Sequence, residues 1–118
     1  MTAQTRTMES EQFARFITAA LDDLKAVNTV TLDVRGLTDL MDYLVLTSGT
    51  SNRHVKSLAS HVSVEAKKQG ISPLGTEGEA AGEWVLVDFG DVVVHVMLPA
   101  TRDFYDLERL WTKADVAT

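Results

Sequence analysis

The most regular pattern of hydrophobic and polar positions lies in residues 84–98, which read WVLVDFGDVVVHVML. Two strongly apolar runs flank Gly90-Asp91, and a two-residue loop that begins with glycine is typical of a type II′ β-hairpin. Such a loop fixes the pairing register, with Val87 opposite Val94. The register places one wholly apolar set of side chains on a single face, which we expect to be core: Val85, Val87, Phe89, Val92, Val94 and Val96.

The other face of this hairpin is mixed and carries Trp84, Leu86, Asp88, Val93, His95 and Met97. Asp88 and His95 occupy diagonal positions where a charged hydrogen bond can form, so we interpret them as a structural pair. The alternative is an acid–base pair, but the sequence places no nucleophile or third group beside them.

Further elements precede the hairpin. Apolar residues recur at three- and four-residue steps from Phe13 to Leu24, which predicts a helix that begins at Glu9 or Ser10. Residues 30–34 alternate as a half-buried strand does, and the continuous run in residues 43–48 predicts a central strand. A small-residue turn then leads into a second helix over residues 53–69, with Gly70 placed for its C′ cap.

The remaining segments flank the hairpin. Residues 71–74 predict a brief extended segment, and residues 75–83 (GTEGEAAGE) predict an acidic loop. Thr101 is a good N-cap for a last helix, whose buried stripe would be Phe104, Leu107, Leu110 and Trp111. We expect flexible tails over residues 1–8 and 113–118 around one domain, residues 9–112. The order predicts the α/β fold class, a single-domain mixed β-sheet flanked by helices.

Composition narrows the classes of protein. The absence of cysteine excludes disulfides, thiolate zinc sites and a cysteine nucleophile. No apolar run is long enough to span a membrane, and the polar start lacks a signal peptide, so we expect a cytoplasmic protein without membrane contact. The net charge of −6 argues against wrapping a nucleic-acid backbone and favours a basic protein partner. We therefore expect little direct nucleic-acid contact.

Acidic residues are concentrated before and within the hairpin. No Lys or Arg occurs between Lys68 and Arg102, and that interval holds Glu77, Glu79, Glu83, Asp88 and Asp91. An acidic loop beside Trp84 is typical of an interaction surface with an aromatic anchor. A solvated loop, with Trp84 covered by the last helix, explains the same pattern, and the sequence leaves both interpretations open.

Catalytic and metal motifs are weak. The strand–turn–helix around Gly49 could place helix amides against a phosphate, but it lacks the spacing of phosphate-binding loops, so a capped helix is the simpler interpretation. His54 and His61 share a helix face without a third ligand. Asp39 and Asp42 could hold magnesium, although loop acids are usually only solvated. We expect no catalytic residue, no metal and no cofactor.

Four ordered motifs carry a family resemblance: DYLVLTSGTSNRHV, PLGTEG, WVLVDFGDVVVHVM and RDFYDLERLW. With them, residues 9–112 resemble the ribosomal silencing factor family, also called Iojap or RsfS. The family pattern is met at Asp42, Gly49, Arg53, His54, Pro73, Gly78, Trp84, Asp88, Gly90, His95, Tyr105 and Trp111.

The resemblance implies a nucleotidyltransferase-like fold without that superfamily's catalytic carboxylates. It also implies a protein that is not an enzyme, which binds ribosomal protein L-fourteen on the large subunit and sterically prevents the small subunit from joining. Translation would thus fall when nutrients are short. The alternative is a small phosphate- or nucleotide-binding enzyme of the same fold that uses the Gly49 turn with Asp39 and Asp42.

Charge and resemblance together suggest where the partner binds. We expect Trp84 to supply the buried contact and Glu77, Glu79 and Glu83 the polar rim, with Asp42 and Tyr43 as neighbours across the sheet. We also expect that the free protein can form a homodimer.

Overall fold

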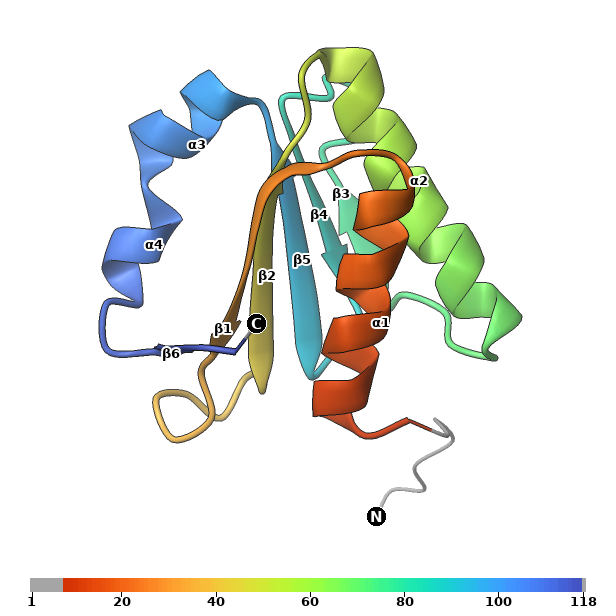
Figure 1. The fold of residues 1–118 in the computed structure, drawn as a ribbon. Helices are drawn as coiled ribbons and strands as arrows, with labels where there is room; N and C mark the ends of the chain where they lie inside the picture. The colour runs from red at the N-terminus through yellow and green to blue at the C-terminus, as the bar shows by residue number, and fades with distance from the viewer. Residues whose placement is uncertain (1–7, 118) are drawn as a thin grey trace.

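The computed structural model describes residues 8–117, so the tail predicted over residues 1–8 lies outside the described part except for Met8, which packs against the core. Its described elements form one six-stranded sheet with helices on both faces (Figure 1). They are α1 Ser10–Asp23, β1 Val27–Asp33, β2 Tyr43–Ser48, α2 Asn52–Lys68, β3 Gly75–Glu77, β4 Trp84–Asp88, β5 Val92–Met97, α3 Pro99–Tyr105, α4 Leu107–Leu110 and β6 Asp115–Val116.

The sheet has the order β3-β4-β5-β2-β1-β6, and it is mixed because β2 and β5 run parallel while the other neighbours are antiparallel. All six residues of β2 are buried, as its continuous run of strand-like residues predicts for a central strand. The predicted fold class, a mixed sheet flanked by helices, is confirmed. The nucleotidyltransferase-like label stays a prediction.

The hairpin formed by β4 and β5 has the predicted register. Val85 pairs with Val96 and Val87 with Val94, and the Phe89 amide donates to the carbonyl oxygen of Val92 across the turn. Every side chain of the predicted core face is buried. The alternation of apolar and polar residues was therefore sufficient to identify the core face of these strands.

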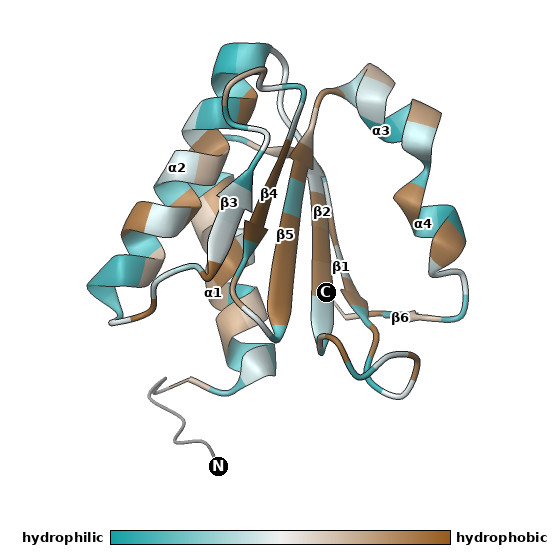
Figure 2. Ribbon diagram, turned by 180° about the vertical axis from the view of Figure 1, so that it is seen from behind, coloured by the Kyte–Doolittle hydropathy of each residue, from teal (hydrophilic) through white to brown (hydrophobic). Residues whose placement is uncertain are grey.

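The two faces of the sheet have different cover. One face, which we call the helical face, packs against α1 and α2. The main core lies between them and includes the fully buried side chains of Phe13, Ile17, Leu58 and Val62. The opposite face, which we call the arm face, is crossed by residues 99–114, the C-terminal arm that contains α3 and α4 (Figure 2). A smaller apolar cluster forms beneath the arm, where Leu107 and Trp111 pack on the sheet.

Both edges of the sheet contain short strands that the sequence did not predict. Gly75–Glu77 was predicted as loop but forms β3, which pairs with β4. The predicted tail over residues 113–118 is also wrong in part, because Asp115–Val116 forms β6 against β1 and the Ala117 amide donates to Thr31 O. Strands this short have no periodicity to detect, so only tertiary pairing defines them.

The last helix was predicted as one continuous stripe, and this prediction is wrong. The helix begins earlier, with Leu98 as N-cap and Pro99 in its first turn, and it breaks at Asp106, which has a φ of 50°. The break separates α3 from α4 and changes which side chains point inward. Leu107 and Trp111 are partly buried, whereas Phe104 and Leu110 are 80% and 74% exposed.

Candidate partner-binding surface

The arm face places Trp84 and His95 side by side at the end of the hairpin nearest α3. The Trp84 indole Nε1 donates a hydrogen bond of 2.9 Å to His95 Nδ1, and the two ring centroids lie 5.9 Å apart. Because the indole N–H can only donate, Nδ1 must be unprotonated and the ring is held as the Nε2–H tautomer. Burial lowers the pKa of His95 to about 4, so this histidine is neutral at pH 7.

The predicted hydrogen bond between Asp88 and His95 is not among the bonds of the described residues. Asp88 instead accepts from the Gly90 amide at 2.8 Å and closes the hairpin turn, while His95 is bonded to Trp84. Asp88 lies directly opposite Val93, and Leu86 opposite His95, so the acid lies two residue pairs nearer the turn than His95. The nearby backbone amide is the closer partner for a side chain this short.

Aromatic rings continue from Trp84 onto the C-terminal arm. Tyr105 lies 4.7 Å from the Trp84 ring, and Phe104 packs edge-on against Tyr105 at 5.0 Å between centroids. Tyr105 is 52% exposed and Phe104 is 80% exposed. We call Trp84, His95, Phe104 and Tyr105 the aromatic surface. Exposed rings held in place by their neighbours are the groups that most often anchor a protein–protein contact.

A buried arginine fixes the arm that carries this surface. Arg102 Nη1 donates to Asn28 O at 2.7 Å and to Ser48 Oγ at 3.2 Å, while Nε and Nη2 bind Glu108 Oε2 at 3.1 and 2.8 Å. One guanidinium therefore joins α3 to α4 and to the ends of β1 and β2. Such charge-assisted contacts hold Tyr105 at a defined position against Trp84.

The predicted rim residues divide between the two faces. Glu83 is exposed and adjoins Trp84, and Glu77 pairs with Leu86, whose side chain faces the arm. Glu79 instead lines a hollow beside α2 together with Lys56 and Lys67, so it lies on the helical side. Only part of the acidic loop thus borders the aromatic surface.

Asp42 and Tyr43 do not adjoin Trp84. Tyr43 pairs with Val92 at the start of β5, whereas Trp84 pairs with Met97 at its end, so the two sites lie at opposite ends of the sheet. Tyr43 is also only 1% exposed. The expectation that these two residues are neighbours of Trp84 across the sheet is therefore wrong. Their contact with a partner stays a prediction.

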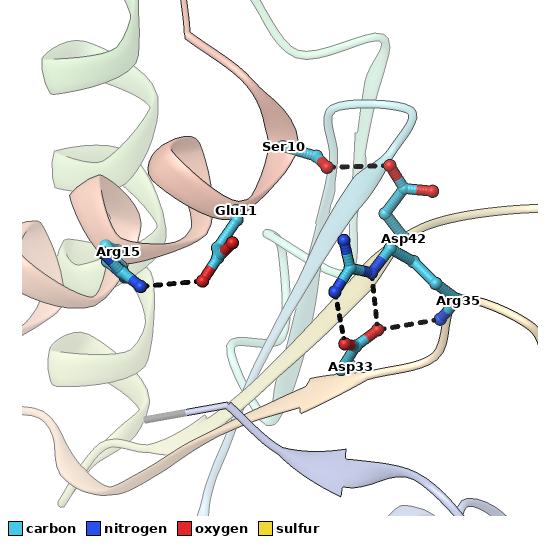
Figure 3. Close-up of polar contacts among 6 residues, drawn as sticks. All are labelled: Ser10, Glu11, Arg15, Asp33, Arg35 and Asp42. Carbon is cyan, nitrogen blue, oxygen red and sulfur yellow. Dashed lines mark hydrogen bonds and ion pairs between the residues drawn. The ribbon is translucent and has the colours of Figure 1, made fainter.

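Asp42 belongs to a polar cluster at the other end of the sheet (Figure 3). Its carboxylate accepts from Ser10 Oγ at 2.8 Å. Beside it, Arg35 binds both carboxylate oxygens of Asp33 at 3.0 and 2.7 Å, which lowers the pKa of Asp33, and its guanidinium lies over the Tyr43 ring. These contacts join α1 to the ends of β1 and β2, so we assign them a structural role.

The alternative nucleotide site is not assembled. Asp42 and Gly49 stand at opposite ends of β2, and at about 3.3 Å per residue they are roughly 20 Å apart. Backbone amides at the Gly49 turn already have partners: Gly49 N donates to Met97 O and Thr50 N to His54 Nδ1. Residues 8–117 also contain no group of three His, Cys, Asp or Glu that could hold a metal ion.

His54 and His61 connect the two helices. His54 Nε2 lies 2.7 Å from Leu24 O, and His61 Nε2 lies 3.0 Å from Asp23 Oδ2, so both rings bind the C-terminal end of α1. Ser51 caps α2 by accepting from the His54 amide, as the turn sequence predicts. The predicted helix-surface role is thereby refined to a contact between helices.

Sequence reasoning missed Phe104 and Tyr105 as surface groups and Arg102 as the buried anchor. The apolar spacing of the last helix assigned Phe104 to the core, and an arginine is a weak signal for burial. The αL residue at Asp106 could have been suspected, because Asp tolerates that conformation better than most residues.

No helix in the described part of the chain is long and apolar enough to cross a membrane. The fold and the surface define a class: a small mixed α/β domain whose aromatic groups are presented on one face by a C-terminal arm. Residues 7–118 match the family described as Ribosomal silencing factor during starvation.

Individual relatives agree with this match. A Chromobacterium violaceum protein named Ribosomal silencing factor RsfS is 49% identical over 104 residues, 88% of this chain and 85% of that protein. A Bacillus subtilis protein of the same name is 36% identical over 110 residues, 93% of each chain. A crystal structure of a C. violaceum protein superposes with a TM-score of 0.87 at 48% identity, covering 89% of this chain and 88% of that one. The chain therefore belongs to the ribosomal silencing factor family.

Proposed function

We propose that this protein binds the large ribosomal subunit through ribosomal protein L-fourteen and sterically prevents the small subunit from joining, which represses translation when nutrients are limited. The observation that carries the proposal is the aromatic surface, exposed on the arm face and bordered by Glu77 and Glu83. The names of the relatives support ribosome association, and the resemblance supplies the particular partner.

The chemistry of the surface fits a basic protein. Trp and Tyr bury large areas at small entropic cost, and a central aromatic group can contribute 2 kcal/mol or more to binding. Acidic groups at the rim attract Lys and Arg side chains and raise the association rate. Ribosomal phosphates repel the same acids, so the net charge of −6 favours docking on a protein.

Blocking requires occupation of space and no chemical step. The domain measures 39 × 33 × 22 Å, and a rigid body of that size on the joining surface excludes another macromolecule from the same volume. The enzyme alternative is not favoured, because its two elements lie at opposite ends of β2. A cytoplasmic location and a homodimer of the free protein stay predictions.

Co-sedimentation with purified large subunits tests the binding site. Replacing both exposed rings, Phe104→Ala with Tyr105→Ala, should weaken binding at least tenfold, mainly through faster dissociation. The matched control is Leu40→Ala, which removes a side chain that is 84% exposed in the β1–β2 loop, and it should bind like the parent.

Charge reversal tests the rim separately. Glu77→Lys with Glu83→Lys should slow association and weaken its dependence on salt. Circular dichroism should confirm that each variant is folded. If the folded ring variant binds as tightly as the Leu40→Ala control, the aromatic surface does not contact the ribosome.

A further inference from the structure

The exposed side of α2 carries a line of basic and hydroxyl side chains. Arg53, Lys56, Ser60 and Lys67, which we call the basic stripe, recur at helical spacing and are all exposed. They lie on the side opposite the buried residues Val55, Leu58, Ala59, Val62 and Ala66. Teal, hydrophilic segments run along α2 in Figure 2.

The local charge of α2 is opposite to that of the whole protein. Four of the eleven Lys and Arg residues lie between Asn52 and Lys68 with one acid, Glu65, so the helix carries 4 − 1 = +3 in a chain of net charge −6. Lys68 is paired with Glu65 at 2.8 Å. Among the described residues, no salt bridge is formed by Arg53, Lys56 or Lys67, so these cations are free for an external anion.

Neighbouring groups leave the stripe accessible. Lys56, Ser60 and Lys67 line a hollow of about 360 Å³ between α2 and the segment around Thr76, and Glu79 also lines it. Asp23 lies on the other flank of α2, where it is bonded to His61. Glu79 therefore competes with an external anion for Lys56 and Lys67.

Only acids close to α2 can reduce this positive charge. Solvent-exposed charges are largely screened beyond a Debye length of about 8 Å at physiological ionic strength. Glu77 lies on the arm face, across the sheet from α2. Glu83 lies nearer, because a Cβ at the preceding residue, Gly82, would come within 2.8 Å of Lys56 Cε. Glu79 and Glu83 therefore offset part of the charge of Arg53, Lys56 and Lys67, and an anion that approaches the stripe still meets a net positive charge.

Chemistry favours a nucleic-acid backbone over an acidic protein. Lys, Arg and Ser are the side chains that commonly contact phosphates, and a straight line of cations matches a repeating anion. A protein contact would require buried aromatic anchors, whereas the large apolar side chain exposed on α2 is Val64.

We infer that the basic stripe of α2 binds the phosphate backbone of RNA. The contact is independent of sequence, and it lies on the opposite face from the aromatic surface. The net charge of −6 predicts little nucleic-acid contact. Net charge sums over the whole chain, however, and does not show that the cations of α2 lie together on one face.

Fluorescence anisotropy with a labelled single-stranded RNA of mixed sequence, about 20 nucleotides long, tests the inference on the full chain. The Lys56→Gln, Lys67→Gln double variant should reduce the slope of log K against log salt by about 1.4, because each lost phosphate contact removes about 0.7. Its affinity at about 50 mM salt should fall at least tenfold. Glu79→Gln should bind more tightly than the parent.

The matched control is Arg109→Gln with Lys113→Gln, which removes the same charge from exposed positions on the arm. Equal weakening by both double variants, or no binding of RNA by the parent, would overturn the inference. Preferential binding of a polyglutamate peptide at the stripe would also overturn it and assign α2 to an acidic protein. The assay contains no ribosomal protein, so its failure leaves the proposed subunit binding untouched.

Discussion

Trp84 and His95 hold each other through one hydrogen bond, and that bond makes the arm face sensitive to acid. Protonating His95 at Nδ1 would remove the acceptor of the indole N–H and place a charge in a largely buried site. The folded-state pKa of His95 is about 4, well below the value near 6.5 expected in an unfolded chain. Between these values the unfolded chain binds more protons, so stability falls as the pH falls.

We predict that His95→Gln flattens this dependence. From pH 7.5 to 5 the parent should lose about 2 kcal/mol of unfolding free energy through His95, whereas a glutamine, which accepts from Trp84 without titrating, should not. Urea unfolding of both proteins measures the difference. Parallel stability curves would show that His95 does not titrate in this window.

Some buried residues could be predicted from the sequence, and others could not. The core positions of the hairpin followed from alternation, which is a local property of the chain. Arg102 is buried only because Asn28, Ser48 and Glu108 converge on its guanidinium. These three partners come from separate parts of the chain. The sequence next to Arg102 therefore does not predict that this residue is buried.

The conformation of the segment between β3 and β4 requires a glycine at position 78. Gly78 has a φ of 88°, and a Cβ at this position would overlap the carbonyl oxygen of Trp84. The loop therefore packs directly against the backbone that positions the tryptophan. Gly75, three residues earlier, has no heavy atom within 4 Å of the corresponding Cβ position.

Replacing Gly78 by Ala should destabilise the protein by about 2 kcal/mol or more, through strain at positive φ and through the overlap with β4. The Gly75→Ala control should change stability by less than about 0.5 kcal/mol. Thermal unfolding measures both, and binding to large subunits should weaken for Gly78→Ala because Trp84 shifts. A Gly78→Ala protein as stable as the control would show that the loop adapts freely.

The longer helices and strands could be predicted, because their apolar positions repeat several times. The short strands could not. The first helix, the second helix and the central strand each contain enough repeats for a clear stripe or run, and Gly70 ends α2 with a φ of 78° as expected. The strands β3 and β6 have three and two residues, too few for any pattern. The arm was predicted as one helix because apolar spacing does not reveal the break at Asp106.

As a whole, the protein places its aromatic surface and the cations of α2 on opposite faces of one sheet. Trp84, Phe104 and Tyr105 lie on the arm face with acids at the rim, and the cations of α2 lie on the helical face. A domain with two such faces can be held in one orientation on a surface made of both protein and RNA. The net charge of −6, which guided the choice of partner, does not reveal this division.

The central claim is that the aromatic surface docks the protein on the large subunit and that docking alone prevents joining. Light scattering of purified subunits, mixed after the large subunit has been incubated with the protein, measures this directly. The parent and Leu40→Ala should abolish the rise in scattering at saturating concentration, and the Phe104→Ala, Tyr105→Ala variant should need at least tenfold more protein. A folded ring variant that blocks joining at the same concentration as the parent would contradict the account.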